Sequence, residues 1–145
     1  MDIEQKLEIL RKLDTKPLLA KLTEYEDELE QALTQQADFT SHNYNYIAAR
    51  GSDCSMVKDI IAELSFQAPE INEAGKKTTV AERDAWLQGQ RKANQELTDA
   101  LAQQREVAFL QDNCQIRCEM AKKHLEGTRA VLALKIAQIN FLGSE

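Results

Sequence analysis

The chain has 145 residues, of which 29% are charged and 6% aromatic, and its formal net charge is −6. With only five glycines and two prolines, this composition favours a helical fold over a sheet or a disordered chain. Acidic residues dominate positions 1–40, whereas basic residues dominate positions 113–142. This asymmetry indicates either a nucleic-acid-binding face or helix surfaces of complementary charge.

The N-terminal sequence MDIEQKLEIL is acidic and amphipathic, unlike a secretory signal. Three cysteines without a secretory context fit a reducing compartment, so we expect a cytoplasmic protein. The apolar stretch from Ala130 to Leu142 is shorter than the roughly 20 residues that cross a bilayer. We therefore expect no association with a membrane.

The first predicted element is a short helix over residues 2–13. Its apolar residues recur at helical spacing and line one face: Ile3, Leu7, Leu10 and Leu13. The following sequence KLDTKP contains the capping candidates Asp14 and Thr15, and Pro17 fits the first turn of a second helix.

The second predicted element is a long helix over about 17–66. Its first half has the alternating three-and-four spacing of a heptad seam, at Leu18, Leu22, Tyr25, Leu29, Ala32, Gln36 and Phe39. The stretch 41–57 is rich in poor helix formers. Its apolar residues nevertheless continue the same phase as far as Leu64, which favours one continuous helix. A break at residues 51–53, beside Gly51, is the alternative.

A turn is predicted at residues 67–78, which contain Pro69 and Gly75. Thr79 and Glu82 have the spacing of a capping box, which starts a third helix that we expect to run over 79–142. The apolar positions of this helix drift around its surface: Leu87, Leu97, Leu101, Ala108, Cys114, Cys118, Ala121, Leu125, Leu132 and Ile139.

Two long helices joined by a short turn fold back on each other, because neither buries its apolar stripe alone. The predicted fold is therefore all-α: a single domain over residues 1–145, built as a long antiparallel, coiled-coil-like hairpin. Pairing across the turn joins positions whose numbers sum to about 145, so Trp86 meets Ile60. Residues after Thr128 then extend beyond the second helix, and the short helix 2–13 packs on this C-terminal end.

The C-terminal end has more apolar residues than one short helix covers. They point in several directions, and we expect another copy of the chain to cover the remainder. The predicted oligomer interface consists of Val131, Leu132, Leu134, Ile136, Ile139, Phe141 and Leu142.

No arrangement of polar residues predicts an active site. Cys114, Cys118 and His124 resemble metal ligands, but the hairpin places Cys54, the fourth candidate, more than ~30 Å from Cys114. Cys114 and Cys118 lie on one helical face and are interpreted as core residues. His42 and His124 lack a neighbouring nucleophile. We therefore expect no enzyme, no metal, no cofactor and no small-molecule substrate.

Basic residues cluster on the third helix, at Arg117, Lys122, Lys123, Arg129 and Lys135. On an accessible face they would bind the phosphates of a nucleic acid. The alternative is a solvated face, or one paired with the acidic residues of 24–30, which the hairpin places opposite residues 115–121.

The segments GKKTTVAERDAW (75–86) and RAVLALKIAQI (129–139) resemble small helical-hairpin proteins of phages and prophages. The resemblance covers roughly Val57–Ile139, and the architecture is similar to that of UvsY-type recombination mediators. It implies an oligomer that is phage-encoded, works in the host cytoplasm, and acts in DNA recombination or replication with single-stranded DNA and recombinase partners. The alternative is a protein-only adaptor, scaffold or inhibitor that binds a host or viral protein.

Overall fold

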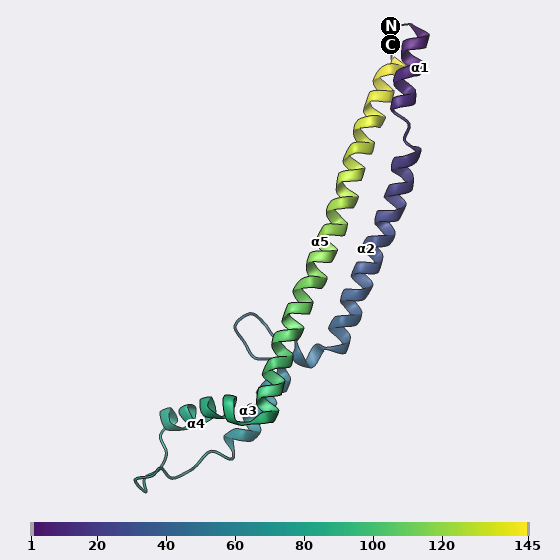
Figure 1. The fold of residues 1–145 in the computed structure, drawn as a ribbon. Helices are drawn as coiled ribbons and strands as arrows, with labels where there is room; N and C mark the ends of the chain where they lie inside the picture. The colour runs from purple at the N-terminus through teal and green to yellow at the C-terminus, as the bar shows by residue number, and fades with distance from the viewer. Residues whose placement is uncertain (1, 145) are drawn as a thin grey trace. The chain divides into compact units, whose positions relative to one another are not determined.

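The computed structural model describes residues 2–144, and its regular elements are all helical (Figure 1). An all-α fold is therefore confirmed, since no strand occurs within this range. The elements are α1 (Ile3–Lys12), α2 (Lys16–His42), the 3₁₀ helix η1 (Tyr44–Tyr46), α3 (Ser55–Ser65), α4 (Val80–Ala93) and α5 (Gln95–Ser144). No helix within residues 2–144 combines the length and apolarity that a membrane span needs.

Where the sequence predicts a single domain, the chain divides into two compact units. Unit 1 consists of Met1–Ala37 and Cys114–Glu145, and unit 2 of Asp38–Asn113. Helix α5 runs through both units, because it begins in unit 2 and contributes its later turns to unit 1.

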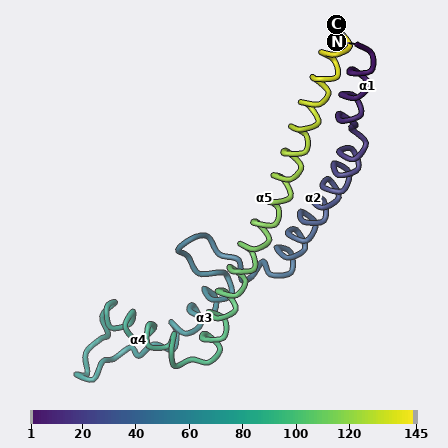
Figure 2. Tube along the Cα trace, turned by 45° about the horizontal axis from the view of Figure 1, so that its top comes forward, coloured from purple at the N-terminus to yellow at the C-terminus, as the bar shows by residue number. Residues whose placement is uncertain are grey.

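In unit 1, α2 and the later turns of α5 lie side by side and run antiparallel (Figures 1 and 2). The predicted seam of α2 is its less exposed face, and Ala32 is its buried residue. The facing residues of α5 alternate at spacings of three and four and are all buried or half-buried: Cys114, Cys118, Ala121, Leu125, Thr128, Leu132, Lys135, Ile139 and Leu142. The interior of unit 1 is thus a narrow seam between two helices, lined mostly by small and aliphatic side chains.

Helix α1 begins at a reciprocal capping box. Asp2 Oδ1 accepts a hydrogen bond from the Gln5 amide at 2.8 Å, and Gln5 Oε1 accepts one from the Asp2 amide at 3.2 Å. The predicted short helix 2–13 is therefore confirmed, but its predicted inner face is only partly right. Leu13 is half-buried and faces α5 as expected, whereas Ile3, Leu7 and Leu10 are exposed and the half-buried Ile9 takes their place.

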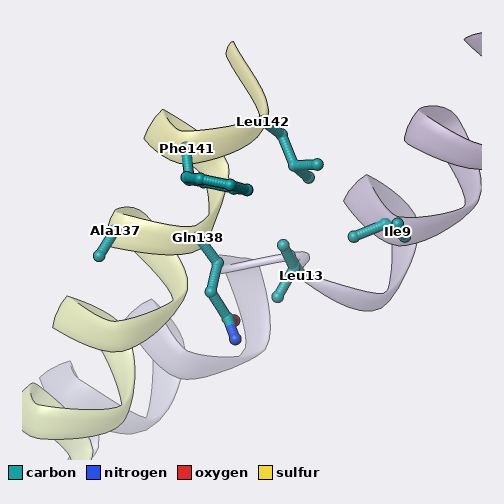
Figure 3. A pocket seen from close by; sticks show the side chains of 6 residues that line it. All are labelled: Ile9, Leu13, Ala137, Gln138, Phe141 and Leu142. Atoms are coloured by element: carbon teal, nitrogen blue, oxygen red, sulfur yellow. The ribbon is translucent and has the colours of Figure 1, made fainter. Parts of the chain in front are cut away.

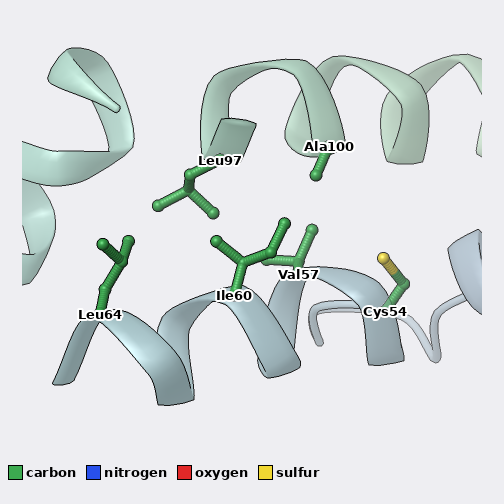
Figure 4. Close-up of a cluster of buried hydrophobic side chains, with 6 residues drawn as sticks. All are labelled: Cys54, Val57, Ile60, Leu64, Leu97 and Ala100. Carbon is green, nitrogen blue, oxygen red and sulfur yellow. The ribbon is translucent and has the colours of Figure 1, made fainter. Parts of the chain in front are cut away.

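Unit 2 has the best-defined core, in which α3 packs on the first turns of α5 (Figure 4). Val57 and Leu97 are fully buried at its centre. Ile60, Leu64 and Ala100 complete the contact, and Trp86 of α4 packs against the cluster. Trp86 and Ile60, which the predicted pairing joins, thus belong to one cluster.

The predicted continuous helix over 17–66 is wrong, because α2 ends at His42 and α3 starts only at Ser55. Polar side chains at the end of α2 bind its last carbonyls: Asn43 Nδ2 donates to Phe39 O at 3.0 Å, and His42 Nδ1 lies 2.7 Å from Asp38 O. Such local bonds compete with helix continuation. Gly51 then adopts a φ of 79°, within the region where the alternative break was expected.

The predicted single helix over 79–142 is also interrupted, at Asn94. Its ψ of 116° ends α4, while its side chain caps α5 by accepting a hydrogen bond from the Leu97 amide at 3.0 Å. At the other end of α4, the predicted cap is present, since the Thr79 hydroxyl accepts from the Glu82 amide at 3.2 Å. Asparagine suits both roles at this position, because it tolerates a non-helical backbone and supplies a capping oxygen.

The segment between α3 and α4 coincides with the predicted turn and is organised by Asn72. Asn72 Oδ1 accepts hydrogen bonds from the amides of Ala74, at 3.1 Å, and Lys76, at 3.0 Å. Gly75 has a φ of 77°, and Ile71 forms an isolated antiparallel bridge with Lys77. The loop is thus held by local hydrogen bonds rather than by an apolar core.

Candidate interaction surfaces

In unit 1, α2 and α5 are joined by polar contacts that define their register. Arg117 Nη1 donates to Gln35 Oε1 at 2.7 Å, and His124 Nδ1 lies 3.6 Å from Glu28 Oε1. The predicted pairing places residue 110, rather than Arg117, opposite Gln35. The predicted register is therefore wrong by seven residues, because the breaks after α2 and at Asn94 change the path that joins the two helices.

The acidic stretch of α2 does meet the basic stretch of α5, although through different residues from those predicted. Arg129 Nη2 lies 3.6 Å from Glu26 Oε1, and the rings of Tyr25 and His124 are 5.2 Å apart. These side chains are largely exposed, so the pairs contribute little to stability. Their main effect is to engage His124 and Arg129 with α2, which leaves other basic residues of α5 more accessible to a ligand.

The five predicted nucleic-acid-binding residues do not share one face of α5. Lys122 and Arg129 are seven residues apart and lie above one another. Lys123 points about 100° away from Lys122, since successive helical residues are rotated by that angle. Lys135 is half-buried in the seam, and Arg117 bonds to α2. Among the five, Arg117 and Arg129 contact α2, whereas Lys122, Lys123 and the half-buried Lys135 form no ion pair or hydrogen bond with the residues that the structure describes.

A second apolar stripe runs along α5 on the side opposite to the seam. It recurs at alternating spacings of four and three, and each member is exposed. We call it the outer stripe, and it consists of Ile116, Met120, Lys123, Gly127, Ala130, Leu134, Ala137 and Phe141. Its four large apolar members are 53%, 53%, 61% and 63% exposed, in the order Ile116, Met120, Leu134 and Phe141. Helix α5 is therefore apolar on two opposite faces: α2 covers one, and the last members of the other, Ala137 and Phe141, lie beside α1.

The structure separates the predicted oligomer-interface residues into two groups. Val131, Leu134, Ile136 and Phe141 are exposed. The others face the interior of unit 1: Leu132 and Ile139 are half-buried, and Leu142 is only 8% exposed. Only the exposed residues are available for an interface at the C-terminal end of α5.

A shallow hollow of about 380 Å³ lies between α1 and the end of α5 (Figure 3). Ile9 of α1 and Leu13, the C-cap residue of α1, line it together with Phe141 and Leu142 of α5. Its polar lining side chain is that of Gln138. Helix α1 also exposes Ile3, Leu7 and Leu10, which lie among exposed charged residues such as Glu4, Glu8 and Lys12.

The three cysteines are free thiols, of which Cys114 and Cys118 lie in the seam of unit 1 and Cys54 lies in unit 2. Cys118 is buried in the seam of unit 1, with its Sγ 3.5 Å from Gln36 Oε1. Cys54 belongs to the core of unit 2. The described residues contain no group of three or more histidine, cysteine or acidic side chains that could hold a metal ion.

Unit 2 contains a half-buried polar network that connects its helices. Asp53 accepts from Arg91 Nη2 at 3.0 Å, and the amide of Cys54 donates to Gln104 Oε1 at 2.7 Å. Gln104 also donates to Asp53 at 3.5 Å. The network ties the start of α3 to α4 and α5, so its evident role is to hold the fold.

Sequence reasoning missed the apolar residues that unit 2 exposes around its ordered loop. Phe66, Ile71 and Val80 are 91%, 64% and 77% exposed. Their exposure could have been inferred from the sequence. These large residues lie within or beside the predicted turn and outside the heptad pattern, so no neighbouring helix is expected to cover them. Of the outer stripe of α5, Leu134 and Phe141 are included in the predicted oligomer interface, but Ile116 and Met120 are left out of it.

Comparisons of the chain with protein-family models, with curated proteins and with solved structures each returned no match.

Proposed function

We propose that this protein is a non-enzymatic, oligomeric helical accessory protein that acts by binding other proteins, including copies of itself, through its helices. The observation that carries the proposal is the outer stripe of α5, whose apolar side chains face solvent although they follow a regular heptad pattern. A heptad pattern on a solvent-facing helix is typical of a surface that packs on another helix.

The energetic argument follows from the size of the exposed side chains. Fully burying a Leu, Ile, Met or Phe side chain contributes about 1.5–3 kcal/mol. Four such side chains on one helix, each more than half exposed, are enough to hold a subunit contact. Exposed apolar surface that follows one face of a helix is typical of a binding surface on a soluble protein.

In the proposed assembly, α2 and α5 form a coiled-coil-like helical hairpin, and hairpins associate through α5. The setting of phage DNA recombination or replication, with a recombinase as protein partner, rests on the resemblance of residues 57–139 to phage helical-hairpin proteins. A protein-only adaptor, scaffold or inhibitor uses the same surfaces and differs in the identity of its partner.

Contact with single-stranded DNA is the second candidate function. The observation that favours it is the position of Lys122 and Arg129 on one exposed face of α5, where DNA phosphates would compete with Glu26 for Arg129. Two cations make a small footprint compared with those of dedicated DNA-binding proteins. We therefore propose DNA contact as an addition to protein binding rather than as its replacement.

The experiment that tests self-association compares two double variants by light scattering at equal protein concentration. M120S/L134S removes two large residues of the outer stripe, and L19S/L33S removes two leucines of α2 that are 47% and 43% exposed. We expect the first variant to shift the mass toward the monomer and the second to leave it unchanged. Equal masses for the wild type and both variants would contradict the proposal.

A further inference from the structure

We propose that two copies of this chain pair through the outer stripe of α5 in one antiparallel register, with Gly127 of each copy against Ala130 of the other. The inference rests on the proposed self-association and specifies its geometry. The chain thus binds itself by an isologous contact, in which each pairing occurs twice about a twofold axis.

The order of residue sizes along the stripe supports a twofold contact centred between Gly127 and Ala130. These two small residues allow the backbones of two helices to approach closely where they cross. Away from a crossing point helices diverge, so larger side chains are needed to fill the space. The stripe supplies them on both sides, because Met120 and Ile116 precede the centre, and Leu134 and Phe141 follow it.

In this register, large residues of one copy lie against small or flexible residues of the other. Met120 of one copy meets Ala137 of the other, and the alkyl stem of Lys123 covers Leu134. Ile116 lies opposite Phe141 at the two ends. Every member of the outer stripe therefore has a partner within unit 1 of the second copy.

The residues that flank the stripe favour this register over its neighbours, since they place no like charges together. On one flank Glu119 faces Asn140 and Glu126 faces Ala133; on the other, Arg117 and His124 face uncharged residues. Moving the centre by one turn toward the N-terminus places Glu126 against its own copy. Moving it one turn toward the C-terminus leaves Ile116 and Met120 uncovered.

A parallel arrangement is disfavoured by the same reasoning. It places each residue against itself, so Lys123 meets Lys123 within the stripe, and Glu119 and Glu126 meet their own copies at its edge. Opposed like charges destabilise helix pairs and select against the wrong partner orientation. Of the arrangements compared, only the antiparallel register centred between Gly127 and Ala130 avoids opposed like charges and also covers every apolar residue of the stripe.

The test uses a pair of variants at one exposed position, L134E and L134K. In the proposed register this side chain lies against Lys123 of the other copy, twice per dimer. The L134E carboxylate then pairs with Lys123, whereas the L134K ammonium is repelled by it. We expect the dissociation constant of L134K to exceed that of L134E by at least about tenfold at low salt. The double variant K123E/L134K should recover the association that L134K loses.

A cross-linking measurement checks the centre directly. Gly127 accommodates a side chain, since a Cβ built there meets no atom within 4 Å. Mixing G127C protein with A130C protein should give a disulfide-linked dimer whose peptides join these two positions, as read by mass spectrometry. Protein carrying I116C alone should not cross-link to its own copy, as a parallel pair would.

The outcomes separate the register from self-association itself. If the wild type associates but L134E and L134K weaken it equally, or if I116C cross-links to itself, the register is wrong and the proposed self-association stands. If the wild type is a monomer at all concentrations, both are wrong. Circular dichroism of L134E and L134K provides the control, because Leu134 is exposed and neither change should alter helicity.

Discussion

The backbone amide of Cys54 donates a hydrogen bond of 2.7 Å to the side-chain Oε1 of Gln104, across 50 residues of sequence. Cys54 is the N-cap residue of α3, and its own side chain makes no capping hydrogen bond. Amides at a helix start need an acceptor, and here another helix provides it. Gln104 therefore acts as a long-range cap that joins α3 to α5.

Replacing Gln104 by Ala should destabilise unit 2, because it leaves the buried amide of Cys54 without an acceptor. We expect the free energy of unfolding to fall by about 1–3 kcal/mol, as measured by urea denaturation. The matched control is Q103A at the neighbouring position, which forms no hydrogen bond with the described residues. A loss of equal size in both variants would show that Gln104 has no capping role.

Replacing Asn94 by Ala should also be destabilising, since it removes the cap of α5. The expected loss is about 1 kcal/mol, and N94D, which keeps a capping oxygen, should lose less than half of this. Both values come from chemical denaturation. Higher stability and helicity in N94A would show instead that α4 and α5 prefer to merge into the single helix that the sequence predicts.

Two glycines of unit 2 should respond in opposite directions to alanine. Gly51 has a φ of 79°, which an alanine adopts only with strain, so G51A should be destabilised by about 1 kcal/mol. Gly89 lies within α4 with open space around its Cβ position, so G89A should be stabilised by about 0.5–1 kcal/mol. Thermal denaturation of the two variants gives the comparison. Destabilisation of both would contradict the helical assignment at Gly89.

If the chain binds single-stranded DNA, the contact should depend on Lys122 and Arg129 and on salt. K122E/R129E should abolish the change in fluorescence anisotropy of a labelled oligonucleotide. The charge-matched control K76E/K77E changes two lysines of the loop in unit 2 and should retain the signal. Each lost phosphate contact should flatten the log–log salt dependence by about 0.7. No signal for the wild type at low salt leaves protein binding as the remaining function.

The elements that could be predicted from the sequence are those defined by local signals. The helical class, the short helix, the turn at 67–78 and the cap at Thr79 each follow from composition, periodicity or a capping pattern within a few residues. The seam of α2 was predictable for the same reason, because its heptad spacing is regular from Leu18 to Phe39.

The breaks were predicted poorly because two local signals conflict at each of them. Residues 43–57 keep the heptad phase of α2, yet Asn43 and His42 bind the last carbonyls of the helix. Because residues 47–54 are not helical, the matching heptad phase of α2 and α3 does not indicate that they are continuous. At Asn94 the capping oxygen outweighs an otherwise helical pattern.

The candidate surface was predicted only in part, because exposure depends on which face a neighbour covers. The apolar end of α5 was evident from the sequence, but Leu142 packs inward while Leu134 faces solvent. On α1 most of the predicted inner face is exposed, since Ile9, together with the predicted Leu13, lines the hollow beside α5 in place of Ile3 and Leu7. The periodicity of the sequence identifies the apolar faces of a helix, whereas the packing of neighbouring helices determines which of these faces stays exposed to solvent.

Sedimentation equilibrium of the wild-type protein over a wide range of concentrations tests the central claim most directly. Self-association through the outer stripe predicts an average mass that exceeds that of one chain and falls toward it on dilution, because an interface of this kind dissociates by mass action. A single species of 16.4 kDa at every concentration would contradict the account.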